Sequence, residues 1–276
     1  YIENGDITVK ASGTEGKNTV SQGNKKDVED TNTIITNQKT DTASSNTVTI
    51  EAGNDKVEVT LKDVNIDVSK QSKAAVSVTG SGNTTIKLDG DNHLTGGNGI
   101  YSNSRGSLTI SGGENDSLTA QGGDSRNGIY SVSGDVTISG GTVTATGGNS
   151  TGSYGSGGDG IRSDGGVTIS GGTVKAAGGD SKNGSGGDGI RGGDIDLSGS
   201  LELTAKAGSP NGKALSQRGN ELDLNTIKDK LGPGAKVTTT DADGKVNQVP
   251  IPGPVEPEEP VIPEESSSSS DGGSSA

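Results

Sequence analysis

The stretch NGIYSVSGDVTISGGTVTATGG, residues 127–148, decides the fold of this chain. It is the clearest of four copies of one unit, which together occupy residues 98–208. Each copy opens on a Gly-Ile step, and successive steps are 29, 32 and 29 residues apart. The steps begin at Gly99, Gly128, Gly160 and Gly189. Such a period is typical of a solenoid, because one short unit buries its apolar face only when a neighbouring unit stacks on it.

Each unit holds three short segments in which apolar and polar residues alternate, as in strands with one buried face. Gly-Gly pairs or clusters of Ser, Asp and Asn separate the segments, and these residues favour tight turns. Three strands and three turns per unit predict an all-β fold, a right-handed parallel β-helix, since parallel crossovers are almost always right-handed. We expect the following side chains of the clearest unit to point inward: Ile129, Val136, Ile138, Val143 and Ala145.

The composition agrees with a thin core. The 276 residues include 49 Gly, only 25% are hydrophobic, and Phe, Trp, Met and Cys are absent. Such a chain would ordinarily be expected to be disordered, but a solenoid is built from stacked rows of Val, Ile, Leu and Ala rather than from one thick core. The lack of cysteine excludes disulfides and cysteine-based metal sites or nucleophiles.

The pattern divides the chain into four parts. Residues 1–55 are weakly patterned and are expected to form an N-terminal cap with an irregular first coil, and residues 56–208 hold the β-helix repeats. Residues 209–246 are expected to form a C-terminal cap, with a short helix over 220–231 that has Asn225 as its N-cap. Residues 247–276 are rich in Pro, Glu and Ser, which predicts a linker without a fold of its own.

Charge and hydropathy limit the partners. The formal net charge is −13, so there is no basic field that would attract nucleic acid or an anionic membrane. No apolar run is long enough for a signal peptide or a membrane span, so we expect no membrane insertion. The chain starts at a tyrosine, from which we expect a processed or truncated chain. The C-terminal linker leads us to expect an extracellular protein that is secreted or attached to a cell surface through this linker. We expect a monomer.

One row of outward side chains is chemically special. If the Ile of each Gly-Ile step points inward, the next residue points outward, and four such residues would stand in one row. They are Tyr101, Tyr130, Arg162 and Arg191. Tyr offers a flat face to a sugar ring and Arg offers a fork that matches a carboxylate, so the row is a candidate binding site for an acidic polysaccharide. Tyr154 lies in a long neighbouring loop and is expected to close over the ligand. The alternative is that the row only covers the sheet.

Acidic residues near the same turns suggest a calcium site, since calcium binds carboxylate and carbonyl oxygens. The candidate ligands are Asp159, Asp188, Asp180 and Asp164. Asp159 and Asp188 occupy matching positions in two copies of GSGGDGI. The spacing does not fit the Gly-rich nonapeptide calcium repeat, and Asp before Gly is also an ordinary turn residue, so both interpretations remain open.

Several motifs resemble those of a known family. The stretch VEVTLKDVNI at residues 57–66, together with LTISGG, VTISGGTVTATGG, DGIRS and DGIRG, is similar to the carbohydrate-binding β-helix family of clostridial and related secreted proteins. The resemblance covers about residues 45–208. It implies a fold like that of pectate lyases and an association with cellulose and acidic sugars, with calcium.

Three functions follow as hypotheses. The first is a non-catalytic carbohydrate-binding module of a secreted or cell-surface protein. The second is a structural or adhesive rod that binds a protein or a host glycan. The third is a lyase-like enzyme, for which Arg162, Arg191 and Asp164 would be available; however, one His and no Cys exclude a Ser/His/Asp or zinc set, and four aromatic residues make a poor glycosidase groove. We expect no enzymatic activity.

Overall fold

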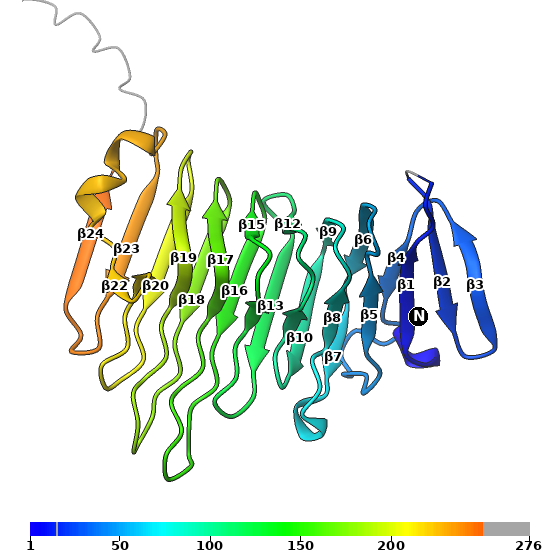
Figure 1. Cartoon of the computed structure of the whole chain (residues 1–276), viewed down its shortest axis with the longest axis horizontal. Coiled ribbons are helices and arrows are strands. Elements are labelled where there is room, and N and C mark those ends of the chain that lie inside the picture. The colour runs from blue at the N-terminus through cyan, green and yellow to red at the C-terminus, as the bar shows by residue number, and fades with distance from the viewer. Residues whose placement is uncertain (15, 251–276) are drawn as a thin grey trace, which may run out of the picture.

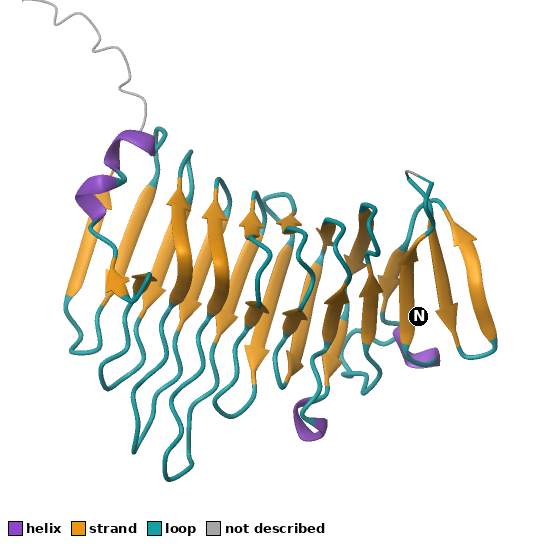
Figure 2. Ribbon diagram, viewed as in Figure 1, coloured by secondary structure: helices purple, strands orange, loops and turns teal. Residues whose placement is uncertain are grey.

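The protein is a rod. The computed structural model describes residues 1–14 and 16–250 and shows an all-β solenoid of about seven turns (Figure 1). Each inner coil contributes strand residues to all three faces, and strands of successive coils pair in parallel. Residues about 30 positions apart in the sequence therefore lie side by side, as the row of strands in Figure 2 shows. The expected parallel β-helix is confirmed.

The first face begins each Gly-Ile coil. Its strands are β1 (Ile7–Ala11), β5 (Val48–Glu51), β8 (Val76–Thr79), β11 (Ile100–Ser102), β14 (Ile129–Ser131), the first part of β17 (Ile161–Ile169), the first part of β19 (Ile190–Leu197) and β21 (Leu215–Gln217).

The second and third faces complete each coil. The second face holds β4 (Ile34–Thr36), β6 (Val57–Lys62), β9 (Thr84–Asp89), β12 (Leu108–Ser111), β15 (Val136–Ile138) and the last parts of β17 and β19. The third face holds β7 (Asn65–Asp67), β10 (Asp91–Gly96), β13 (Ser117–Gly122), β16 (Thr142–Thr146), β18 (Thr173–Ala177), β20 (Glu202–Lys206) and β23 (Lys236–Thr240).

The core is a set of stacked apolar rows. All five inward side chains expected for the clearest unit are fully buried. On the first face, the isoleucines of the four Gly-Ile steps pair in register and have no exposed surface; they are Ile100, Ile129, Ile161 and Ile190. Each row is supported by the coil above and the coil below, which explains how so few hydrophobic residues suffice.

Antiparallel strands close both ends of the rod. At the N-terminal end, a short 3-10 turn η1 (Ile2–Asn4) precedes β1, and β2 (Asn18–Gln22) and β3 (Lys25–Asp30) extend the first face as a hairpin. At the C-terminal end, β22 (Asn220–Glu221) pairs with β21, and β24 (Val246–Pro250) pairs with β23. A further 3-10 turn, η2 (Ser69–Gln71), lies in a loop of the third face.

The helix expected over residues 220–231 is not formed. Two 3-10 turns, η3 (Leu224–Thr226) and η4 (Lys228–Lys230), occupy its place. The capping residue is Asp223 rather than Asn225, since the Asp223 side chain accepts a 2.9 Å hydrogen bond from the Asn225 backbone N–H. No helix of the described residues has the length and apolar character needed to span a bilayer.

The parallel pairing extends beyond residues 56–208 in both directions. β1 already pairs in parallel with β5, and β23 pairs in parallel with β20. The linker expected from residue 247 begins within β24, and the part of it beyond residue 250 lies outside the described residues.

Candidate functional site

The outward row on the first face is formed as expected. Tyr101 pairs in register with Tyr130, Tyr130 with Arg162, and Arg162 with Arg191. The two tyrosine rings meet edge to face, with centroids 5.6 Å apart and an interplanar angle of 76°. The Arg162 guanidinium carbon lies 4.7 Å from the centroid of the Tyr130 ring, within the range of a cation–π contact. These four residues lie side by side on successive strands and are here called the Tyr/Arg row.

The row changes character along the rod. Tyr101 and Tyr130 are half-buried, so each ring packs on its neighbour and leaves part of its surface to solvent. The Arg162 guanidinium, held over Tyr130, also lies 3.4 Å from the Asp164 carboxylate. Arg191 is exposed. The row is therefore aromatic at one end and cationic at the other.

A groove with a volume of about 480 Å³ lies at the cationic end. Arg162 and Arg191 line it together with Asp159, Asp188 and Lys213. The rest of the lining is Gly, Ser and Asn, and no hydrophobic side chain takes part. Three cations and two carboxylates meet in this groove, so it is locally cationic in a chain with a net charge of −13.

The two carboxylates belong to a second row, which stacks through hydrogen bonds to the backbone. In each of the four Gly-Ile coils, the residue before the Gly-Ile step is Asn or Asp. Its side-chain oxygen accepts a hydrogen bond from the backbone N–H of the matching residue in the next coil. The bonds run from Asn127 N to Asn98 Oδ1 at 2.9 Å, from Asp159 N to Asn127 Oδ1 at 2.7 Å, from Asp188 N to Asp159 Oδ1 at 2.7 Å and from Lys213 N to Asp188 Oδ1 at 2.8 Å. We call these residues the Asn/Asp row.

The two rows vary together. In the coils where the Asn/Asp row has Asn, the Tyr/Arg row has Tyr, as in NGIY; where the first has Asp, the second has Arg, as in DGIR. The side-chain oxygens of Asn and Asp can accept the same hydrogen bond from a backbone N–H, so the Asn/Asp row does not require a negative charge. The carboxylates of Asp159 and Asp188 thus accompany the arginines, whose charges they partly balance.

Asp159 is the most perturbed acid of the groove. Its side chain is only 6% exposed. The pKa of this carboxyl is raised from its ordinary value to about 6, chiefly by burial and also by the neighbouring Asp188 carboxylate. The Asp188 backbone N–H and the charges of Arg191 and Arg162 act in the opposite direction.

The four acids named as calcium ligands do not form a cluster. Within residues 1–14 and 16–250, no group of three or more His, Cys, Asp and Glu side chains is placed to hold a metal ion. Asp159 and Asp188 are neighbours in the Asn/Asp row, while Asp180 accepts the Ser209 backbone N–H at 2.9 Å and Asp164 pairs with Arg162. In each of these four carboxylates, one oxygen already contacts a partner within the protein. We therefore assign no calcium site to them.

Tyr154 does not pack on the Tyr/Arg row. It lies in the loop between β16 and β17, one of the long loops that protrude along one edge of the rod in Figure 1. Its side chain is 96% exposed, so it contacts none of the four side chains of the row. Loop length alone could not determine where its tip would lie.

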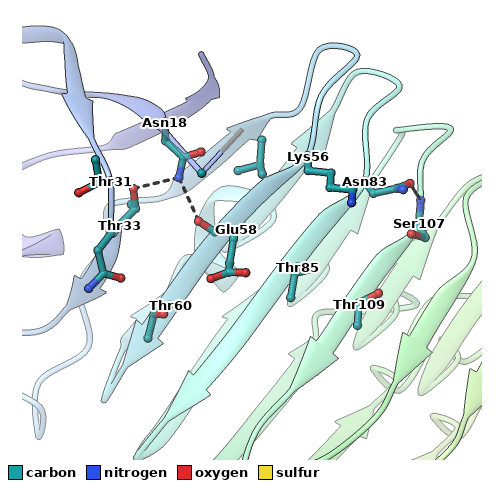
Figure 3. A pocket seen from close by; sticks show the side chains of 13 residues that line it. Asn18, Thr31, Thr33, Lys56, Glu58, Thr60, Asn83, Thr85, Ser107 and Thr109 are labelled. Carbon is teal, nitrogen blue, oxygen red and sulfur yellow. Dashed lines mark hydrogen bonds between the residues drawn. The ribbon is translucent and has the colours of Figure 1, made fainter. Parts of the chain in front are cut away.

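A second groove, of about 520 Å³, lies at the other end of the rod, between the N-terminal hairpin and the second face (Figure 3). Asn18 anchors its wall, since Asn18 Nδ2 donates 3.0 Å hydrogen bonds to Thr33 Oγ1 and to the Glu58 carbonyl. Outward threonines of successive coils, Thr85 and Thr109, form its floor. The lining is mostly hydroxyl and amide groups, and it includes no aromatic side chain.

Comparison with protein-family models, curated proteins and solved structures finds no match for this chain. The β-helix fold therefore rests on the structure itself, and membership of the clostridial family remains a hypothesis.

Sequence reasoning missed two parts of the site. Lys213 enters the groove from the coil after the last Gly-Ile step, where the pattern has become Lys-Ala-Leu and no longer signals a repeat. The stacking of Asn98, Asn127, Asp159 and Asp188 was also missed, although the recurring Asn or Asp before each Gly-Ile step was a usable signal.

Proposed function

We propose that this protein is a non-catalytic carbohydrate-binding module for an acidic polysaccharide, which lies along the Tyr/Arg row with its acidic groups over the groove. The observation that carries the proposal is the register of four side chains in four successive coils, two aromatic and two cationic, beside a polar groove. Parallel strands stand about 4.8 Å apart, so the row presents a chemical group at regular steps along the rod.

The row suits a sugar chain on chemical grounds. A half-buried Tyr ring offers an apolar face to a pyranose ring, and its hydroxyl can bond to sugar oxygens. Arg191 and Arg162 can each hold a carboxylate through paired N–H donors. Lys213 adds a third cation, without the fixed geometry of a guanidinium.

Local charge favours an acidic ligand over a neutral one. The chain as a whole repels polyanions, and the groove is a place where cations outnumber anions. Each exposed ion pair is expected to contribute roughly 0.2–1 kcal/mol and to weaken in salt. Repeated contacts along one polymer add to this modest affinity.

The remaining parts of the proposal follow from the sequence. We propose a secreted or cell-surface location with a C-terminal linker, as expected from the composition of residues 247–276. The resemblance to the clostridial carbohydrate-binding β-helix proteins agrees with this function, and the parallel β-helix fold is the part of the resemblance that the structure bears out. We assign no catalytic residue.

The test is a calorimetric titration with polygalacturonate and with a neutral glucan, at low and high salt, in calcium and in EDTA. We expect binding of polygalacturonate that weakens in salt, and about tenfold weaker binding by Arg162→Ala/Arg191→Ala, since two modest ion pairs are lost. The matched control is Arg105→Ala/Lys175→Ala, which removes the same charge from exposed residues outside the groove.

Three outcomes would overturn the proposal. If the wild-type protein binds no glycan, the row is only a cover on a structural or adhesive rod. If the control variant loses as much affinity as Arg162→Ala/Arg191→Ala, the ligand responds to overall charge and not to this row. Release of unsaturated sugar products from polygalacturonate would instead indicate a lyase.

A further inference from the structure

The N-terminal hairpin ends in an unpaired strand. β3 is the last strand on the path of the large sheet, so one of its edges has no neighbour among the described residues. Lys25 to Glu29 are exposed and only Asp30 is half-buried. An edge strand with free backbone groups can pair with another strand unless something prevents it.

The sequence of this edge is self-complementary. It reads Lys25, Lys26, Asp27, Val28, Glu29, Asp30, with positive charge at the start and negative charge at the end. When two identical strands pair in antiparallel, the start of one lies against the end of the other. The cations of each copy then face the anions of its partner, and cross-strand pairs of opposite charge are favourable.

A β-bulge in β3 determines which of its residues share one face of the strand. Lys25 pairs with Gln22 and Val28 pairs with Val20, so Lys26 and Asp27 together stand opposite Ser21. Asp27 adopts a positive φ of 51°, which accommodates the extra residue. Because of the bulge, Lys25, Val28 and Asp30 share one face of the strand.

We propose that two copies of this chain associate through β3, in antiparallel, around a two-fold axis at Val28. In this register Val28 faces the partner's Val28, and Lys25 faces Asp30 of the partner subunit. Lys26 and Asp27 share the bulge position opposite Glu29 of the partner subunit, where Lys26 is the attractive neighbour and Asp27 the repulsive one. The contact is isologous, so every pair occurs twice. It departs from the monomer expected from sequence.

Two further observations support this register. Val28 is 50% exposed, and it continues the row Val9, Val20 and Val28 outward from the buried end of the sheet, where only Val9 is fully covered. Asp30 Oδ1 accepts a 3.0 Å hydrogen bond from the Asn32 backbone N–H, which leaves its second oxygen for a partner. The ion pairs that the β3 side chains make within the chain are long and exposed. They are Lys17 with Glu29 at 3.9 Å and Lys10 with Asp27 at 3.8 Å.

Charges on an edge strand can also serve to prevent pairing, and charge reversal distinguishes the two roles. The experiment measures the mass of the full chain over a range of concentrations by light scattering after size exclusion. We expect the wild type to reach twice the monomer mass. Lys25→Glu/Lys26→Glu and Glu29→Lys/Asp30→Lys should each stay monomeric, and an equimolar mixture of the two should recover the doubled mass.

A cross-linking experiment tests the axis. The chain has no cysteine, so Val28→Cys introduces a single thiol, which should form a disulfide-linked dimer on mild oxidation. Val246→Cys is the control, since Val246 is similarly exposed on the last strand, β24. A wild type that is monomeric at every concentration would overturn the proposal. So would a mixture of charge variants that stays monomeric, or equal cross-linking of the two cysteine variants.

Discussion

The backbone N–H of Asp188 donates a 2.7 Å hydrogen bond to Oδ1 of Asp159, a side chain that is almost completely buried one coil earlier. Asn127 makes the same kind of bond one coil before, as a neutral residue. Either Asn or Asp therefore fits this position of the Asn/Asp row. The buried charge of Asp159 lowers stability and is not needed for the hydrogen bonds of the row.

We predict that Asp159→Asn stabilises the protein at pH 7.5 much more than at pH 4. The folded protein holds the Asp159 proton with a pKa of about 6, above the ordinary value of 3.8. Between these values the folded state binds more protons than the unfolded state, so this group makes the free energy of unfolding fall as pH rises. A pKa difference of about 2 corresponds to about 3 kcal/mol.

Denaturant titrations of both proteins at the two pH values, in EDTA, measure this difference. Asp180→Asn is the control, because its carboxylate accepts the matching bond from the Ser209 N–H in an exposed position. A gain from Asp159→Asn that is equal at both pH values would contradict the prediction.

We predict that Asn127→Ala destabilises the protein by about 1–3 kcal/mol, because the buried N–H of Asp159 loses its acceptor. Asn149→Ala removes the equivalent acceptor of Asp180 on the exposed side, where water can replace it, and should cost less. Thermal melts of the two variants make the comparison. Equal losses of stability in the two variants would mean that burial of the Asn127–Asp159 hydrogen bond does not affect its contribution.

We predict a large difference between two neighbouring substitutions in β15. Ile138→Asp places an unpaired charge in the core and should cost roughly 3–5 kcal/mol, whereas Thr137→Asp lies on the outer face and should cost at most about 0.5 kcal/mol. Urea midpoints measure both, and similar midpoints would show that the inward and outward positions are wrongly assigned.

We predict that Gly128→Ala is not tolerated. A Cβ at this position would lie 2.8 Å from the carbonyl oxygen of Gly160 in the next coil and 2.8 Å from the Thr146 backbone nitrogen. Backbone atoms on both sides would have to shift, at a cost of about 1–3 kcal/mol or more. Gly152→Ala, in open space, is the control. Unchanged melting of Gly128→Ala would show that the coils can separate at this turn.

We predict that Tyr130→Leu weakens polygalacturonate binding about threefold to tenfold, since in the proposed complex the ring faces the ligand, and since it also supports Arg162. Tyr154→Leu removes a ring that packs on nothing in the row and should have little effect. Titrations of the two variants decide between them. A larger loss from Tyr154→Leu would move the site to the long loop.

Alternation and period predicted most of the fold. The strand phase at Ile129, Ile138 and Ile161 follows from the burial of one face, and stacking requires every coil to repeat it. The same phase is sufficient to place Tyr130 and Arg162 in one outward row. In a repeat, residues at the same position of successive units are neighbours in space, so the sequence period alone predicts these contacts.

Features without a repeat were less predictable. Whether Asp223 or Asn225 caps the turn after β22 depends on local hydrogen bonds, and both are good capping residues. The position of Tyr154 depends on a loop with no counterpart of the same length. The burial of Asp159 depends on the loops around this residue. An Asp before Gly in the sequence does not indicate whether its side chain is buried.

The coils of this protein differ in length most at one corner, where the third face passes to the first through the long loops. Parallel strand pairing continues on all three faces across coils of 29 and 32 residues, with one register shift in the pairing of β17 with β19, between Ser163 and Gly166. Insertions and deletions at that corner therefore leave the scaffold unchanged while they reshape the wall of the groove. Loop length at this corner can therefore change during evolution while the stacked rows of the core stay the same.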